Sequence, residues 1–178
     1  MSSARVVDTN VLIVASAADD SSPFRPDSTP VEDAALRTRV LKWLMAFEED
    51  SQRHAVLDNG WKICKEYKNK LTDQDYGWMA LMVKIDRSQV VWVNLEMDAD
   101  GHAILPTTLA PNVTDLADRK IVAAVLAGQA EGIDCKLTNA CDTDWLDCAV
   151  ALTAHGVEVE HIIKDWLVAK WTTMHGQA

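Results

Sequence analysis

The acidic residues of this chain that could carry out chemistry share one kind of position. Each stands at or just past the end of a predicted β-strand, or in an early turn of the helix that follows such an end. They are Asp8, Asp58, Glu66, Asp118, Asp142 and Asp144. Because ligands of open α/β sheets bind outside the carboxyl ends of the strands, we expect these acids to share one site.

Several carboxylates in one pocket predict a bound metal ion. They repel one another, and some take up protons unless cations bind between them. Carboxylate oxygens are hard ligands that suit Mg²⁺ and Mn²⁺, and Mg²⁺ keeps several waters and binds substrate phosphate oxygens as well. A bound metal lowers the pKa of a water, and a second metal about 3.5–4 Å away stabilises the leaving oxygen. The acids therefore predict hydrolysis of a phosphodiester.

Asp8 has the most distinctive surroundings of these acids. The β-branched pair Val6 and Val7 leads directly into it, and a second apolar run begins at Val11. This pattern predicts a short buried strand that delivers the carboxylate to its end and turns at once into a helix. Asp115, in contrast, is explained by capping or by a solvated charge in the first turn of a predicted helix.

The elements that must position the acids alternate along the chain. Further strands are predicted over 55–58, 89–94, 134–138 and 157–162. Helices are predicted over 10–16, 31–50, 61–71, 73–86, 114–128, 145–155 and 163–173. In the clearest of these helices, Thr114 is the expected N-cap and Gly128 the expected C-cap. The alternation predicts an α/β fold with a mostly parallel sheet and helices on both faces.

Composition places the chain among ordinary globular proteins. Its 178 residues, 48% hydrophobic and 25% charged, predict a single domain over 1–178. No apolar run approaches the ~20 residues of a membrane span, and no secretory signal is recognised at the N-terminus. We therefore expect a cytoplasmic protein with no membrane partner.

Charge and cysteine content narrow the function classes. A formal net charge of −10 argues against a protein that coats nucleic acid. It does not argue against an enzyme that acts on nucleic acid through bound metal, because cations neutralise such a site locally. The four cysteines form no C-x-x-C pair and are expected to be reduced, buried thiols.

The segments around the acids resemble the four motifs of the PIN-domain nucleases. They are 6–12 (VVDTNVL), 66–67 (EY), 118–124 (DRKIVAA) and 138–145 (TNACDTDW). They occur in the expected order and span nearly the whole chain. The resemblance implies a PIN-like, Rossmann-like three-layer α/β/α sandwich with a central, mostly parallel sheet. It also implies a divalent-metal-dependent endoribonuclease that uses Mg²⁺ or Mn²⁺.

By position, the resemblance makes four acids the catalytic, metal-binding quartet. They are Asp8, Glu66, Asp118 and Asp142. Asp144 is then a fifth acid near the metal. Three residues separate Thr138 from Asp142, where many family members have one, so either Asp142 or Asp144 fills the fourth acidic position.

Three polar residues are expected to orient the metal ligands rather than to bind metal. Thr9 and Asn10 match the small polar groups that the family places after its first aspartate, where they hydrogen-bond to the ligands. Asp58, at the end of the second predicted strand, is assigned to the same group.

Basic residues near the acids are candidates for substrate binding. Lys62 and Lys65 lie within about a third of the circumference of the helix over 61–71, at about 100° per residue, and Arg119 and Lys120 follow Asp118. Such a strip can hold a phosphate backbone, although a solvated helix face explains the same residues. Trp61 and Trp145 flank the predicted site and suit either base stacking or core packing.

Two other functions stay open from the sequence. One is a non-catalytic PIN-like module that binds RNA or a protein. The other is a Mg²⁺-dependent phosphatase with Asp8 as nucleophile, although Asn10 stands where haloacid-dehalogenase-like enzymes usually carry a second aspartate. The family includes toxin-type members, although the insertion over 17–30 makes this chain longer than they are. The partners considered are therefore an RNA substrate, a second copy in a homodimer and an antitoxin-like protein.

Overall fold

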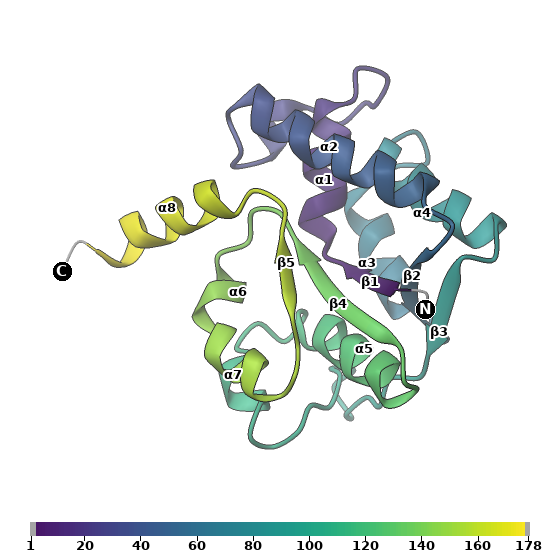
Figure 1. Cartoon of the computed structure of the whole chain (residues 1–178), viewed down its shortest axis with the longest axis vertical. Coiled ribbons are helices and arrows are strands. Elements are labelled where there is room, and N and C mark those ends of the chain that lie inside the picture. The colour runs from purple at the N-terminus through teal and green to yellow at the C-terminus, as the bar shows by residue number, and fades with distance from the viewer. Residues whose placement is uncertain (1–2, 177–178) are drawn as a thin grey trace.

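A parallel β-sheet forms the centre of the computed structural model, which describes residues 3–176 (Figure 1). Its strands are β1 (Ser3–Val7), β2 (Arg53–Asp58), β3 (Val90–Val93), β4 (Asp134–Asn139) and β5 (Val159–His161). They lie in the order β3-β2-β1-β4-β5, and every neighbouring pair is parallel. Residues 1–2 and 177–178 lie outside the described part. Residues 1–2 belong to the N-terminus in which no secretory signal is recognised.

Helices cover both faces of this sheet. They are α1 (Thr9–Ala18), α2 (Ala34–Glu49), α3 (Lys62–Lys70), α4 (Tyr76–Asp86), α5 (Arg119–Ala130), α6 (Asp144–Asp147), α7 (Ala149–Ala154) and α8 (Lys164–His175). Helices α1, α2 and α4 pack together on one face, α5 crosses the other, and α8 extends away from the sheet (Figure 1). The predicted Rossmann-like three-layer α/β/α sandwich is confirmed. Within residues 3–176, no helix combines the length and apolar character needed to cross a membrane.

Burial explains the apolar residues at the end of β1, where Val6 and Val7 precede Asp8. A central parallel strand is covered by helices on both faces, so successive side chains are all removed from water. Val6 and Val7 point to opposite faces and are both buried in the core. Val11 and Leu12, in the first turn of α1, are fully buried as well.

The structure corrects the bounds of the predicted helix over 114–128. The helix begins only at Arg119, because the preceding residues form a separate turn. In that turn the Asp115 carboxylate accepts a hydrogen bond from the Ala117 backbone N–H at 2.8 Å. Thr114 is therefore not the N-cap of α5.

Gly128 is a packing residue rather than the predicted C-cap. The helix continues past it to Ala130. A Cβ atom at Gly128 would lie 3.3 Å from the Cβ atom of Cys135 in β4, so the glycine lets α5 approach the sheet closely. Gly132, with a φ of 78°, takes the left-handed conformation after the helix.

The strand order places a crevice at the carboxyl end of β1. The first half of the chain builds the sheet outward from β1 through β2 to β3, and the second half continues on the other side through β4 to β5. Ligands of open α/β sheets bind at such a switch point. Asp8 follows β1 at this point, and its backbone N–H donates to the Thr138 carbonyl oxygen of β4 at 3.0 Å.

A close helix crossing gives the first prediction. A Cβ atom at Gly77 of α4 would lie 2.5 Å from the Leu12 carbonyl oxygen of α1. Alanine is the better helix former in isolation, but here the overlap forces the helices apart. We expect Gly77→Ala to lower the free energy of unfolding by about 1–3 kcal/mol or more, measured by urea denaturation. The control is Met79→Ala on the same helix, at a side chain that is 38% exposed. A stability gain at Gly77 would contradict this packing.

Candidate metal centre

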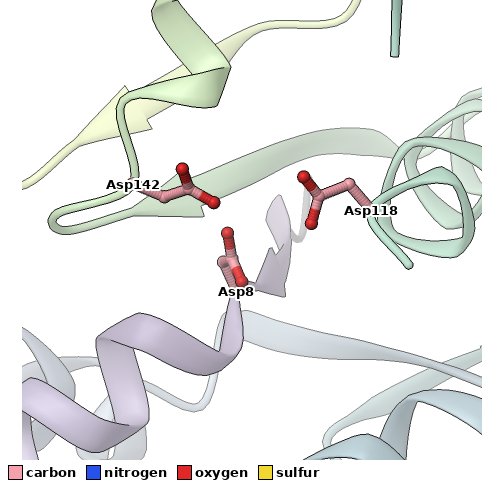
Figure 2. A group of neighbouring side chains, drawn as sticks. All are labelled: Asp8, Asp118 and Asp142. Atoms are coloured by element: carbon pink, nitrogen blue, oxygen red, sulfur yellow. The ribbon is translucent and has the colours of Figure 1, made fainter. Parts of the chain in front are cut away.

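Three aspartates from separate parts of the chain meet at the switch point. Asp8 follows β1, Asp118 immediately precedes α5, and Asp142 lies between β4 and α6. One carboxylate oxygen of each lies within 4.8 Å of the others, and Figure 2 shows the three carboxyl groups pointing toward one another. They line a pocket of about 620 Å³. The structure thus brings together three of the four acids of the predicted quartet.

A second acidic group adjoins the first and shares one of its members. Carboxylate oxygens of Asp115, Asp118 and Asp144 also lie within 4.8 Å of one another. Asp142 therefore accompanies Asp8, whereas Asp144 accompanies Asp115. The sequence interpretation of Asp115 as a cap was incomplete, because the turn that its carboxylate caps also brings it beside Asp118. The three-residue spacing of the two aspartates is the signal that could have indicated this.

Glu66, the fourth predicted acid, lines the same pocket but has its own partners. Its Oε1 atom accepts a hydrogen bond from the Thr9 hydroxyl at 2.9 Å. Its Oε2 atom forms an ion pair with the Lys120 ammonium group. Lys120, predicted to contact substrate, thus balances the charge of Glu66 in this structure. Thr9 orients Glu66, in line with the role expected for it.

Asp8 is the most buried of the three converging aspartates, at 5% exposure. Burial raises its pKa to about 7, and the negative charges of Asp142 and Glu66 add to this increase. The Trp145 indole N–H donates to the Oδ2 atom of Asp8, and this hydrogen bond acts in the opposite direction by favouring the ionised form. Trp145 is fully buried, so its role is to hold Asp8 rather than to stack on a ligand.

The pKa values of the two neighbouring aspartates are raised as well. Burial, followed by the charges of Asp8 and Asp142, raises the pKa of Asp118 to about 8. Burial likewise raises the pKa of Asp142 above its usual value. None of the ion pairs formed among residues 3–176 includes these three carboxylates. The pocket therefore favours either protons or a bound cation.

An amide pair fixes the loop that carries Asp142. The Asn10 side-chain oxygen accepts hydrogen bonds from the backbone N–H groups of Ala140 and Cys141, and its NH₂ group donates to the Asn139 side-chain oxygen at 3.0 Å. The Asn139 side-chain oxygen accepts a hydrogen bond from the Asp142 backbone N–H at 3.1 Å, and its NH₂ group donates to the Asp142 carbonyl oxygen at 3.0 Å. The resemblance implied a direct hydrogen bond from Asn10 to a metal ligand, whereas these bonds of Asn10 fix the loop that carries Asp142. The role of Asn139 was not recognised from the sequence.

Asp58 supports the site from outside the pocket. Its buried carboxylate accepts hydrogen bonds from the backbone N–H groups of Lys62 and Ile63, at 2.9 Å and 2.8 Å. It therefore caps the start of α3 and does not contact the acids. Because α3 carries Glu66, the cap fixes that residue indirectly. The buried hydroxyl of Tyr67 ties the same helix to β1 by donating to the Val7 carbonyl oxygen.

The basic residues predicted to bind substrate divide into two groups. Lys62, Lys65 and Lys120 line the pocket. Arg119 does not, because its guanidinium group donates to the carbonyl oxygens of Val113 and Ala110, at 3.2 Å and 3.0 Å. It holds the irregular segment before α5 instead.

The fold and the pocket define a parallel α/β protein with a carboxylate-lined site at its topological switch point. Comparisons with models of known protein families, with curated proteins and with solved structures find no match to this chain. What the site can do therefore follows from its donors.

The donors of the pocket fit a hard divalent cation. Among the described residues, no histidine or cysteine lines it. The four cysteines are buried free thiols, and one of them, Cys148, lines the smaller pocket beside Asp115, Asp118 and Asp144. A set made only of carboxylates suits Mg²⁺ or Mn²⁺ better than Zn²⁺, which favours nitrogen and sulfur ligands. Asp118, shared between both acidic groups, gives the site room for two neighbouring cations.

The raised pKa values predict an unusual pH dependence of stability. Asp8 and Asp118 bind protons in the folded protein up to about pH 7 and 8, whereas the unfolded chain releases them near pH 4. Metal-free protein should therefore lose stability as the pH rises from about 5 to 8. Asp8→Asn should lessen this loss by at least about 1.4 kcal/mol, the equivalent of one pKa unit, measured as the free energy of unfolding by urea in EDTA. Asp134→Asn is the control, because Asp134 is an exposed acid at the amino end of β4, whereas the pocket lies at the carboxyl ends of the strands. Parallel curves of stability against pH for the unmodified protein and both variants would contradict this origin of the pH dependence.

The ion pair of Glu66 yields a separate prediction. Lys120→Met removes a positive charge from the pocket and frees Glu66 for a cation. We expect Mn²⁺ to bind severalfold more tightly than to the unmodified protein, measured by isothermal titration calorimetry. Lys65→Met is the matched control, because Lys65 lines the same pocket and forms none of the ion pairs found among the described residues. Weaker Mn²⁺ binding by Lys120→Met than by the control would show that the pair assists binding.

Proposed function

We propose that this chain is a divalent-metal-dependent endoribonuclease of the PIN type. One observation carries the proposal: Asp8, Asp118 and Asp142 converge on one pocket, their oxygens lie within 4.8 Å, and none of the three is neutralised by an ion pair within residues 3–176. Such a set is unfavourable unless protons or cations bind. The resemblance of the surrounding segments to the PIN motifs supplies the choice of RNA as substrate.

The residues of the chain divide the work between holding a cation and holding a phosphodiester. Asp8, Asp118 and Asp142 would hold Mg²⁺ or Mn²⁺. When bound, the cation lowers the pKa of a water and stabilises charge on the phosphate. The ammonium groups of Lys62 and Lys65, on the rim of the same pocket, would neutralise backbone phosphates.

Glu66 and the second acidic group add to this arrangement. The Glu66 carboxylate is fixed by Thr9 and Lys120 beside the pocket, where it would orient the attacking water by accepting a hydrogen bond. Asp115 and Asp144 stand on the other side of Asp118 and would accept a second cation near the leaving oxygen. When water attacks the phosphorus and the 3′ oxygen leaves, the products carry a 5′-phosphate and a 3′-hydroxyl.

The geometry favours this function over a phosphatase with Asp8 as nucleophile. Haloacid-dehalogenase-like enzymes, which use that mechanism, usually carry a second aspartate two residues after the nucleophile. Asn10 occupies the position in question, and both ends of its amide are engaged by Asn139 and by the loop that follows. As part of the same proposal, the protein acts on RNA in the cytoplasm, and a homodimer and an antitoxin-like partner stay predictions from the resemblance.

Cleavage of single-stranded RNA tests the proposal. The protein should cleave in Mn²⁺ and lose activity in EDTA. Asp118→Asn, at the acid shared by both groups, should reduce the rate by more than the about 10–100-fold typical of residues that only orient metal ligands. Asp134→Asn is again the control. Product ends are read by susceptibility to a 5′-phosphate-dependent exonuclease. Cleavage that survives EDTA, or equal rates for both variants, would refute the proposal.

A further inference from the structure

Two tryptophans stack on one another at the surface beside the pocket. The ring centroids of Trp61 and Trp92 lie 6.0 Å apart, and the ring planes differ by 19°. Trp61 immediately precedes α3 and is 44% exposed, and Trp92 lies in the edge strand β3 and is 39% exposed. Aromatic rings dominate binding surfaces because they bury a large area at little cost in conformational freedom. An exposed stacked pair is therefore a candidate contact surface.

The backbone of Trp61 is held in an unfavourable conformation. Its φ of 60° and ψ of 20° lie in the left-handed region, which bulky residues rarely adopt. Glycine or asparagine would adopt it at less cost. Backbone strain of this kind is concentrated at functional sites. The strain therefore indicates that the indole ring at position 61 has a use that outweighs its conformational cost.

The pair adjoins the lysine rim of the acidic pocket. Lys62 follows Trp61 directly, and its side chain lines the pocket together with Lys65 and Glu66. Glu66 lies one helical turn further along α3 than Lys62, so the helix leads from the tryptophan pair to the pocket.

We infer that Trp61 and Trp92 form a stacking platform for an unpaired nucleobase of the same strand whose phosphate is held at the acidic pocket. The location of that phosphate rests on the proposed function, whereas the stacking itself needs no metal. Every nucleobase offers a flat aromatic face, and bases stack on exposed tryptophan rings in proteins that bind single strands. Lys62 and Lys65 would hold the phosphates between the platform and the acids.

The surroundings of the pair fit a base better than a protein partner. Polar residues flank both tryptophans along the chain. The exposed amides of Asn59 and Asn94, each two residues from a tryptophan, are hydrogen-bonded to each other at 2.8 Å, and Lys62 follows Trp61. A stable protein interface needs about 800 Å² on each partner. Two rings bordered by amides and an ammonium group instead match one base and its phosphate.

Binding of a fluorescent single-stranded RNA to the Asp8→Asn protein in Mg²⁺ tests the platform without cleavage. Trp61→Gly and Trp92→Ala should each weaken binding by about 5–150-fold, the range that single stacking contacts contribute. Met45→Ala, at an exposed apolar side chain of α2, should leave binding unchanged. Trp61→Gly should keep its Tm within a few degrees, because glycine suits the left-handed conformation.

RNA that lacks its bases provides the decisive comparison. It should bind the Asp8→Asn protein more weakly than intact RNA, and Trp61→Gly should weaken this binding no further. Equal losses on intact and abasic RNA would overturn the platform, and so would unchanged affinity in both tryptophan variants, as expected of a protein-binding surface. Those results leave the cleavage assay and the proposed function untouched. Absence of any RNA binding would overturn both.

Discussion

The carboxylate of Asp8 is held out of water at the end of the central strand, and the rest of the site responds to that constraint. Buried valines precede it and a buried helix turn follows it, so only 5% of the residue stays exposed, where it lines the pocket. An isolated charge in such a place is costly. The Trp145 N–H offsets part of the cost, whereas Asp118 and Asp142 increase it. The pocket is therefore an acceptor for positive charge, in the form of protons or a cation.

Negative and positive side chains line different parts of this pocket. On one side, aspartates face one another without ion-pair partners among the described residues, and on the other Glu66 is matched by Lys120 and bordered by Lys62 and Lys65. A phosphodiester with a metal ion presents the complementary arrangement, because the cation meets the aspartates and the phosphate oxygens meet the lysines. Asn10, which also lines the pocket, fixes the backbone of the loop that carries Asp142.

Much of the fold could be read from the sequence because it depends on local patterns. Alternating apolar runs and helical periodicity predicted the five strands and the parallel three-layer arrangement. Helix ends were less predictable. The start of α5 moved from Thr114 to Arg119 because a turn capped by Asp115 competes with the helix. Gly128 was mistaken for a cap because its contact with Cys135 comes from another element.

The sequence by itself determined which residue types stand at the ends of the strands, and so which acids could meet. Only the tertiary structure decided which of them do. It grouped Asp8, Asp118 and Asp142, and it placed Asp115 in a second cluster with Asp118 and Asp144. It also paired Glu66 with Lys120. It also stacked Trp61 on Trp92. The physical reason is that a few ångströms decide whether carboxylates share a cation or rings share a face. Such distances depend on strand order and loop paths, which no local pattern of residues specifies.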